Sequence, residues 1–239
     1  MALSFRFSKQ QLQHVAVFAM LLNHVRHLVF PPGSVCGFVF ENIGYFTAPV
    51  MCWFLVQGFH RTRSHKQYFL RLLFFAVLSQ GVYSMYFGPP YRLNMLFTLC
   101  ICFLILVVRS SGLDYGMKLF LQVLAVVCTS FCDWPYIAAI AVVLFDMAFR
   151  KGTRPFVRMA FLAVAFLSAV FLGLGCESVY FSPGLRFAAG FAGPAMAGVC
   201  IVRFLDAGKP AGCTPRLYFY WFYPVHLSVL LVLRCLAVH

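Results

Sequence analysis

Long apolar stretches alternate with short polar turns along the whole chain. A helix needs about 20 mostly apolar residues to cross the hydrocarbon core of a bilayer, and proline, glycine and charged positions divide this sequence into stretches near that length. The pattern predicts membrane-spanning helices over residues 11–30, 36–59, 67–87, 92–109, 117–131, 134–149, 156–175, 184–203 and 216–236. We therefore predict an all-α, polytopic integral membrane bundle of about nine helices, with residues 1–239 forming a single transmembrane domain.

The composition excludes a water-soluble protein. Of the 239 residues, 62% are hydrophobic and only 10% are charged, whereas a soluble domain is about half apolar and a quarter charged. A disordered chain is excluded too, because so much apolar surface has to be buried. The lipid bilayer is thus the first predicted partner.

The net charge of +13 would suggest a nucleic-acid partner in a soluble protein. In a membrane protein it is explained by the enrichment of Lys and Arg in cytoplasmic loops, so no nucleic acid is expected. With nine spans and the N-terminus inside, only Arg26, Arg92, Arg186 and Arg234 lie in the outer half. Fifteen basic residues lie on the inner side: Arg6, Lys9, Arg61, Arg63, Lys66, Arg71, Arg109, Lys118, Arg150, Lys151, Arg154, Arg158, Arg203, Lys209 and Arg216. This bias predicts a cytoplasmic N-terminus and an outer C-terminus.

The ten cysteines predict neither a disulfide framework nor a metal site. Most of them lie inside apolar stretches without the paired spacing of a zinc or haem motif, and they are typical of small core residues. We predict no metal.

Polar side chains within the first span are candidates for function, because they are costly in a membrane. Asn23, His24, Arg26 and His27 follow one another closely and can share a helix face. Arg26 and His27 can instead reach the outer interface, and His24 can simply bond to a neighbouring helix. His24 lies deeper in the span than Arg26 and His27, so we interpret it as a functional residue, with Asn23 beside it.

A second histidine, His226, lies near the middle of the last span, two residues after Pro224. Proline opens a local kink by removing a backbone donor. His226 is either a hydrogen-bonded strut or a proton-handling group, and the presence of His24 favours the second.

Two further polar residues lie at the predicted outer side. Asn94, at the start of the fourth span, can orient a histidine or donate to a carbonyl oxygen, or it can cap its helix. Asp133 lies in the short turn between the fifth and sixth spans. It can cap the following helix, with Pro135 early in that helix, or it can be a catalytic residue or contact a substrate amine.

A cationic segment follows the second span and contains Arg61, Arg63, Lys66 and Arg71. The positive-inside bias explains most of this charge. The same residues would also suit a polyanionic cytosolic ligand, such as a phosphorylated cofactor.

Small residues are concentrated in the eighth span, where residues 188–198 are mostly Ala and Gly. Such a stretch favours close packing of helices and would also admit a thin ligand.

The order of several motifs resembles the TraX family of polytopic membrane proteins. They are MLLNH at 20–24, IGYFTAPVM at 43–51, VQGFHRTR at 56–63, YFLRL at 68–72, NMLFT at 94–98, DW at 133–134 and YPVHL at 223–227. The similarity extends from end to end. The family usually has Asp where this chain has Asn23 and Arg where it has Tyr45.

The resemblance implies an acetyltransferase related to membrane-embedded acyltransferases and associated with N-acetylation of pilin. It implies acetyl-CoA as the acyl donor, with its phosphates at the cytoplasmic cations. The acceptor would be an amine or hydroxyl on a pilin-like peptide N-terminus, a cell-surface glycan or a lipid. His24 would be the general base, Asn23 or Asn94 would stabilise the oxyanion, and His226 would be a second proton-handling or acceptor-binding group.

Two other classes of function fit the same residues. A small proton-coupled transporter would use the buried histidines with Arg92 and Asp133 as a relay. A non-enzymatic membrane scaffold would use the polar residues only to hold helices together.

Overall fold

The computed structural model describes residues 6–89, 91–175, 180–206, 215 and 217–237. Lys209 and Arg216, which the charge count assigns to the inner side, lie outside the described residues. The helices are α1 (Lys9–Val29), α2 (Val35–Gly44), α3 (Thr47–Arg61), α4 (His65–Phe87), α5 (Met95–Ser110), α6 (Tyr115–Cys128), α7 (Ile137–Lys151), α8 (Arg154–Gly175), α9 (Pro183–Val199) and α10 (Tyr218–Ala237). A 3₁₀ turn, η1 (Thr129–Phe131), follows α6, and a π-helical turn, η2 (Cys200–Phe204), extends α9.

The predicted helical class is confirmed. Five helical segments of the described chain are long and apolar enough to cross a membrane, namely Val35–Arg61, His65–Phe87, Arg154–Leu172, Pro183–Phe204 and Tyr218–Ala237. Met95–Ser110 and Tyr115–Phe131 are shorter apolar helices. The protein is therefore a helical membrane protein, while the count of nine spans and their orientation stay predictions.

The stretch predicted as one helix over 36–59 is two helices. α2 ends at Gly44, and α3 begins at Thr47 after a turn at Tyr45 and Phe46. Pro49 explains the break, because its ring opposes a continuous helix at the carbonyl four residues earlier, that of Tyr45, yet proline is tolerated in the first turn of a new helix.

Polar side chains set the starts of most helices. Each accepts a hydrogen bond from a backbone N–H of the first turn, which would otherwise lack a partner. These capping residues are Ser8, Ser34, Ser64, Asn94, Asp114 and Ser182.

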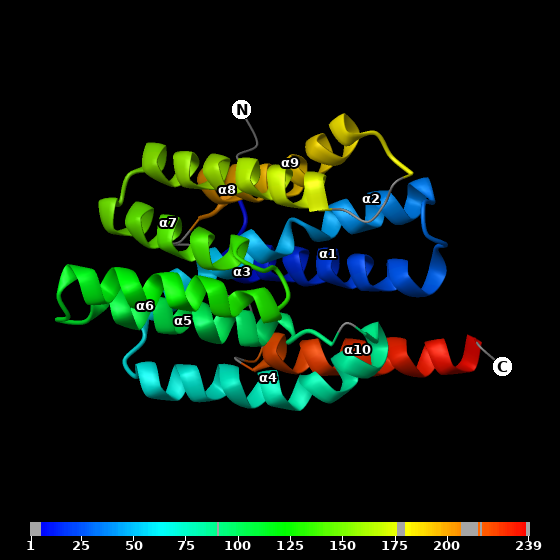
Figure 1. The fold of residues 1–239 in the computed structure, drawn as a ribbon, viewed down its shortest axis with the longest axis horizontal. Helices are drawn as coiled ribbons and strands as arrows, with labels where there is room; N and C mark the ends of the chain where they lie inside the picture. Colours follow the sequence, from blue (N-terminus) through cyan, green and yellow to red (C-terminus); the bar gives the residue numbers. More distant parts are fainter. Residues whose placement is uncertain (1–5, 90, 176–179, 207–214, 216, 238–239) are drawn as a thin grey trace. The chain divides into compact units, whose positions relative to one another are not determined.

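The chain divides into two compact units, residues 1–51 with 152–219 and residues 52–151 with 220–239. In the first unit α8 packs along α9 and α1 packs along α2 (Figure 1). Glycines of α9 allow close packing on α8 and on the end of α2, since a Cβ on Gly198 would lie 2.6 Å from Cβ of Phe161, and one on Gly193 would lie 2.9 Å from Cβ of Tyr45. Helix packing therefore fills the space along this stretch of small residues.

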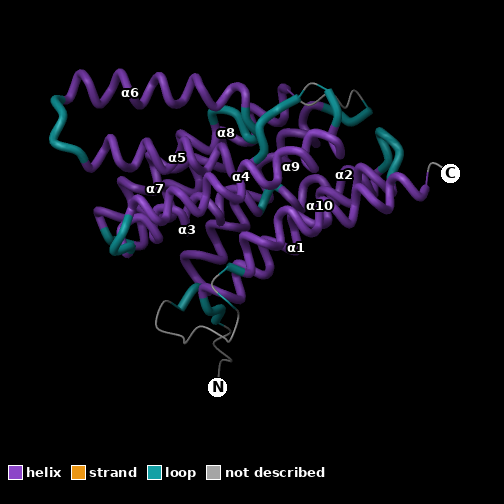
Figure 2. Tube along the Cα trace, turned by 90° about the horizontal axis from the view of Figure 1, so that it is seen from below, coloured by secondary structure: helices purple, strands orange, loops and turns teal. Residues whose placement is uncertain are grey.

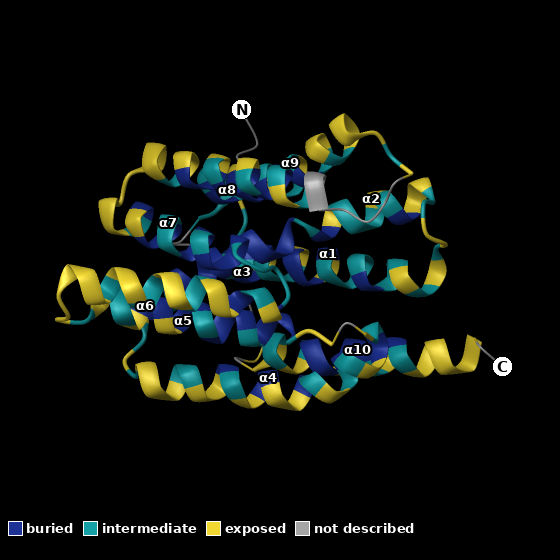
Figure 3. Ribbon diagram, in the orientation of Figure 1, coloured by how far each residue is buried: buried dark blue, intermediate teal, exposed yellow. Residues whose placement is uncertain are grey.

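The second unit is built around α5. α5 packs against α4, α6 and α7, and Figure 2 shows α5 and α6 side by side, joined by a short turn. The α3 part of this unit is mostly buried, whereas no residue of α6 is buried (Figure 3). The exposed apolar face of α6 suits contact with lipid.

Contacts within the second unit show which helix ends lie together. His60, Arg109 and Arg150, from the C-terminal ends of α3, α5 and α7, meet at one end. At the opposite ends of α5 and α7, the backbone of Leu93 pairs with that of Phe131 and Asp133. Arg234 of α10 donates to the carbonyl oxygen of Tyr86 at the C-terminal end of α4. The loop after α3 and the C-terminal end of α10 thus lie at opposite ends of this unit.

Candidate functional site

The polar residues of the first predicted span form a cluster between α1 and α2. His24 is buried. The amide of Asn23 donates to the backbone carbonyl of Glu41 at 3.0 Å, and Arg26 forms an ion pair with the Glu41 carboxylate at 2.9 Å. Tyr45 donates its hydroxyl to the same carboxylate at 3.0 Å. Asn23 therefore joins two helices directly beside the buried histidine.

Glu41 is the member of this cluster that sequence reasoning missed. The signal for it is the turn at Pro31, Pro32 and Gly33, which folds α1 back against α2. Arg26 lies five residues before this turn and Glu41 eight residues after it, so folding α1 back on α2 brings their opposite charges together. The pair is only partly exposed, at 24% and 19% of the two side chains.

His226 is buried in α10 of the second unit. Its Nδ1 lies 2.7 Å from the carbonyl oxygen of Phe222, and its ring stacks on the Phe222 ring with centroids 4.8 Å apart. A bond from Nδ1–H to a carbonyl places the lone pair of the neutral imidazole on Nε2. This tautomer suits a group that accepts a proton.

Asn94 is fully buried and caps α5. Its Oδ1 accepts from the N–H of Leu96 at 2.9 Å. Its amide donates to the carbonyl of Ala76 at 2.8 Å and to Oε1 of Gln80 at 2.9 Å. These bonds use both amide protons, so Asn94 is equipped to hold α4 against α5.

Asp133 lies in the turn between η1 and α7 and does not cap α7 by its side chain in the way the sequence suggested. Its Oδ1 accepts from the N–H of the next residue, Trp134, at 3.0 Å, and α7 begins only at Ile137. Burial raises the pKa of Asp133 to about 6, although the Trp134 N–H and the charge of Arg92 act in the opposite direction.

Three of the predicted site residues are brought together in the second unit. The carbonyl of Asp133 accepts from the hydroxyl of Thr98, one turn after Asn94. Tyr223 lies close enough to Asp133 for an electrostatic interaction, and the Tyr223 and His226 rings are 5.6 Å apart. Asn94, Asp133 and His226 are thus linked in this unit through Thr98 and Tyr223, whereas His24 and Asn23 belong to the first unit.

The predicted cofactor-binding cations are exposed. Arg61 ends α3, Arg63 lies in the following turn, and Lys66 and Arg71 lie on α4. Arg71 also lies over an aromatic ring, with its guanidinium carbon 5.7 Å from the centre of the Tyr68 ring. All four charges are accessible to a ligand at this end of the unit.

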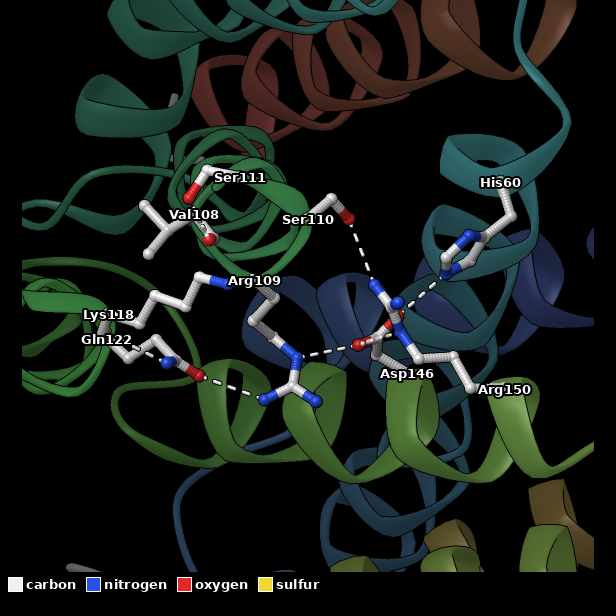
Figure 4. A network of polar contacts seen from close by, with 9 residues as sticks. All are labelled: His60, Val108, Arg109, Ser110, Ser111, Lys118, Gln122, Asp146 and Arg150. Carbon is white, nitrogen blue, oxygen red and sulfur yellow. Dashed lines mark hydrogen bonds and ion pairs between the residues drawn. The ribbon is translucent and has the colours of Figure 1, made fainter. Parts of the chain in front are cut away.

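A buried carboxylate next to this cationic loop was missed as a site by sequence reasoning. Asp146 of α7 is fully buried and contacts His60 at 2.7 Å, Arg109 at 2.7 Å and Arg150 at 3.0 Å (Figure 4). The available signal was an acid in an apolar span followed four residues later by Arg150, a favourable spacing on a helix. Its contacts with α3 and α5 required the tertiary structure.

The comparisons with known proteins agree with the sequence resemblance. The model of the family described as TraX protein matches residues 8–234. The chain is 32% identical to the probable fimbrial assembly protein FimC, serogroup H1, of Dichelobacter nodosus, over 94% of each chain. No solved structure was found to match. With a family match over nearly its whole length, this helical membrane protein belongs to the TraX family.

Proposed function

We propose that the protein is a membrane-embedded acyltransferase that uses acetyl-CoA to acetylate an amine of a pilin or fimbrial subunit. The observation that carries this proposal is the end-to-end match to the TraX family, for which the resemblance implies pilin N-acetylation. A relative named as a fimbrial assembly protein supports the same class of acceptor. The bacterial inner membrane is the proposed location, because the donor is cytosolic and the acceptor is assembled outside.

The residue proposed as general base is His24. It is buried in α1, and a histidine side chain is suited to general base catalysis near neutral pH. A neutral imidazole accepts the proton that the acceptor amine loses as its nitrogen bonds to the acetyl carbon, and the carbon–sulfur bond then breaks to release the thiol. The acyl donor supplies an activated thioester.

Asn23 is the proposed donor to the oxyanion that develops in this step. One amide proton is used in the bond to the Glu41 carbonyl, and the side chain carries a second. Because both amide protons of Asn94 are engaged, we assign Asn94 a positioning role. For His226 and Asp133, which belong to the second unit, we propose a proton-handling role.

The exposed cations are proposed to hold the donor's phosphates. Guanidinium groups at Arg61, Arg63 and Arg71 and the ammonium of Lys66 match the charge of phosphate, and guanidinium also matches its geometry.

The test is acetyl transfer in membranes that contain the protein. Radiolabelled acetyl-CoA and a pilin peptide with a free N-terminus are supplied to the wild type, to His24→Ala and to the matched control His27→Ala, an exposed histidine on the same helix. Loss of a general base lowers the rate about 100-fold to 10,000-fold, so His24→Ala should lose nearly all transfer while His27→Ala keeps it. Full activity in a well-inserted His24→Ala protein would remove His24 from the mechanism, and no transfer by the wild type would refute the proposed function.

A further inference from the structure

The ion-pair cluster around Asp146 has a layered arrangement. The carboxylate is completely buried, Arg109 is 19% exposed, and Arg150 is 46% exposed. A molecule that approaches from the solvent therefore meets the guanidinium groups before the carboxylate. Figure 4 shows both arginines directed to Asp146, with Arg109 coming from α5 and Arg150 from α7.

Asp146 also fixes the orientation of both guanidinium groups. Nε of Arg109 donates to Oδ2 at 2.7 Å, and Nε of Arg150 donates to both carboxylate oxygens, at 3.1 and 3.0 Å. One terminal nitrogen of each group is held by a neutral partner. Arg109 Nη1 donates to Gln122 at 3.1 Å, and Arg150 Nη2 donates to Ser110 at 3.0 Å. Both planes are thus held in place before any ligand binds.

Each guanidinium keeps donors for a ligand. A guanidinium has five N–H donors, and in the described part of the chain Nη2 of Arg109 and Nη1 of Arg150 make no bond. Two arginine charges exceed the single carboxylate charge, even with His60 neutral. A phosphate group, with three acceptor oxygens and up to two negative charges, matches oriented guanidinium donors in both charge and geometry.

We propose that Arg109 and Arg150, positioned by Asp146, form a phosphate-binding site for the acyl donor. The inference rests on the proposed function, which supplies a phosphorylated donor at this end of the unit. His60 joins the site to the cationic loop that begins at Arg61, because its Nε2 bonds to Asp146 and its ring stacks on Phe149 with centroids 4.8 Å apart. The loop attracts the polyanion, and the oriented pair binds one of its phosphates.

The competing explanation is that the cluster only ties helix ends together. The C-terminal ends of α3, α5 and α7 each carry a partial negative charge, which stabilises arginines there. Substitutions that separate charge from geometry distinguish the two explanations. Arg150→Lys keeps the positive charge but loses the planar guanidinium. Asp146→Asn adds net positive charge but loses the carboxylate that positions the arginines. The control Lys151→Gln removes a charge from the next residue of α7.

The experiment measures binding to the purified full chain in an uncharged detergent. The probes are coenzyme A, adenosine 3′,5′-bisphosphate and phosphate-free pantetheine. Arg150→Lys and Asp146→Asn should weaken binding of the two phosphorylated probes about 10-fold or more, since one charge-assisted hydrogen bond contributes about that factor. Binding of pantetheine should not change, and Lys151→Gln should resemble the wild type.

Unchanged binding by Arg150→Lys, or tighter binding by a folded Asp146→Asn, would overturn the inference. Arg150 is nearly half exposed, so Arg150→Lys decides the matter even if Asp146→Asn does not fold. Phosphatidylglycerol added in the same detergent forms a second arm. If only the lipid's binding depends on Arg150, the site takes a lipid headgroup and the assignment to the donor is refuted.

Acetyl transfer by the same samples separates this inference from the proposed function. If acetyl groups are transferred but the binding of coenzyme A does not depend on Arg150, only the phosphate site is refuted. If the binding of coenzyme A depends on Arg150 but no acetyl group reaches the pilin peptide, the proposed function is refuted and the phosphate site remains.

Discussion

The structural bonds that single residues make in this protein determine which of the predicted roles remain open to them. Asn94 is the clearest case, because a side chain with the composition of an oxyanion donor is fully occupied as a helix cap and an interhelical tie. Asn23 bonds across to α2 with one amide proton. The contacts show how many hydrogen-bond donors a residue has left. That number decides whether we assign the residue a positioning role or a role in the chemistry.

The first prediction at this scale concerns Asp133. Its carboxyl titrates at about 6 in the fold against an ordinary pKa of 3.8, so the folded state binds the proton more tightly than the unfolded state does. As the pH rises from about 4 to 6, ionisation of Asp133 therefore lowers the free energy of unfolding by up to about 3 kcal/mol. The loss persists at higher pH. Asp133→Asn should be more stable than the wild type at pH 7.5 and should lose that advantage near pH 4. Thermal unfolding in detergent measures the difference, and parallel pH profiles of the two proteins would contradict it.

The second prediction concerns the exposed arginines of the loop after α3. Charge reversal at Arg61 and Arg63 together should raise the apparent KM for acetyl-CoA more than it lowers kcat, because these side chains are proposed to attract phosphate rather than to touch the reacting atoms. Steady-state transfer kinetics at two ionic strengths provide the check. A lower kcat at unchanged KM would exclude a role in binding the donor.

At the scale of elements, the pairing of α1 with α2 depends on one glycine. A Cβ on Gly44 would lie 2.3 Å from Cβ of Asn23, so the two helices approach each other at the residue that precedes the buried His24. The break between α2 and α3 directly follows this glycine. Close approach and helix break together hold Asn23 against Glu41.

Gly44→Ala should therefore destabilise the fold by about 1–3 kcal/mol, as overpacking of a close contact does, and should lower acetyl transfer. Gly81→Ala is the matched control, because Gly81 is also helical and a Cβ there has no atom within 4 Å. That control should be neutral or more stable by up to about 1 kcal/mol, since alanine is the better helix former. Thermal unfolding of both variants measures the effect, and equal stabilities would show that α1 and α2 adjust at no cost.

At the scale of the whole molecule, the basic residues predict an orientation that the second unit can test. Arg109 and Arg150, both assigned to the inner side by charge, meet His60 at one end of this unit. Arg234, assigned to the outer half, lies at the opposite end beside Tyr86. Charge bias and contacts therefore agree on which helix ends belong together.

Reporter fusions should place residues 64, 113 and 152 on the cytoplasmic side and residue 133 and the C-terminus on the outer side. The reason is that the ends of α3, α5 and α7 share one ion-pair cluster, while Lys and Arg favour the cytoplasmic side. Each position is fused to two reporters in turn, one active only outside the membrane and one active only in the cytoplasm. Residue 64 and the C-terminus on the same side would refute the nine-span arrangement.

The sequence by itself determined the helical membrane class, the family and most helix positions. These depend on apolar length, on proline and glycine positions and on motif order, which are properties of neighbouring residues. The candidate residues His24 and His226 also emerged from the sequence, because an ionisable group in an apolar span is conspicuous on its own. The single transmembrane domain and the roles of the two histidines stay predictions.

Only the tertiary structure decided which polar groups bond to one another. The Glu41 cluster depends on the packing of α1 on α2, and the Asp146 cluster joins residues as distant in sequence as His60 and Arg150. Similarly, the two helices in place of one over 36–59 follow from the position of Pro49 together with the close approach at Gly44. Hydropathy averages over a stretch and so cannot show a break of two residues or a contact between helices, because both are set by geometry rather than by composition.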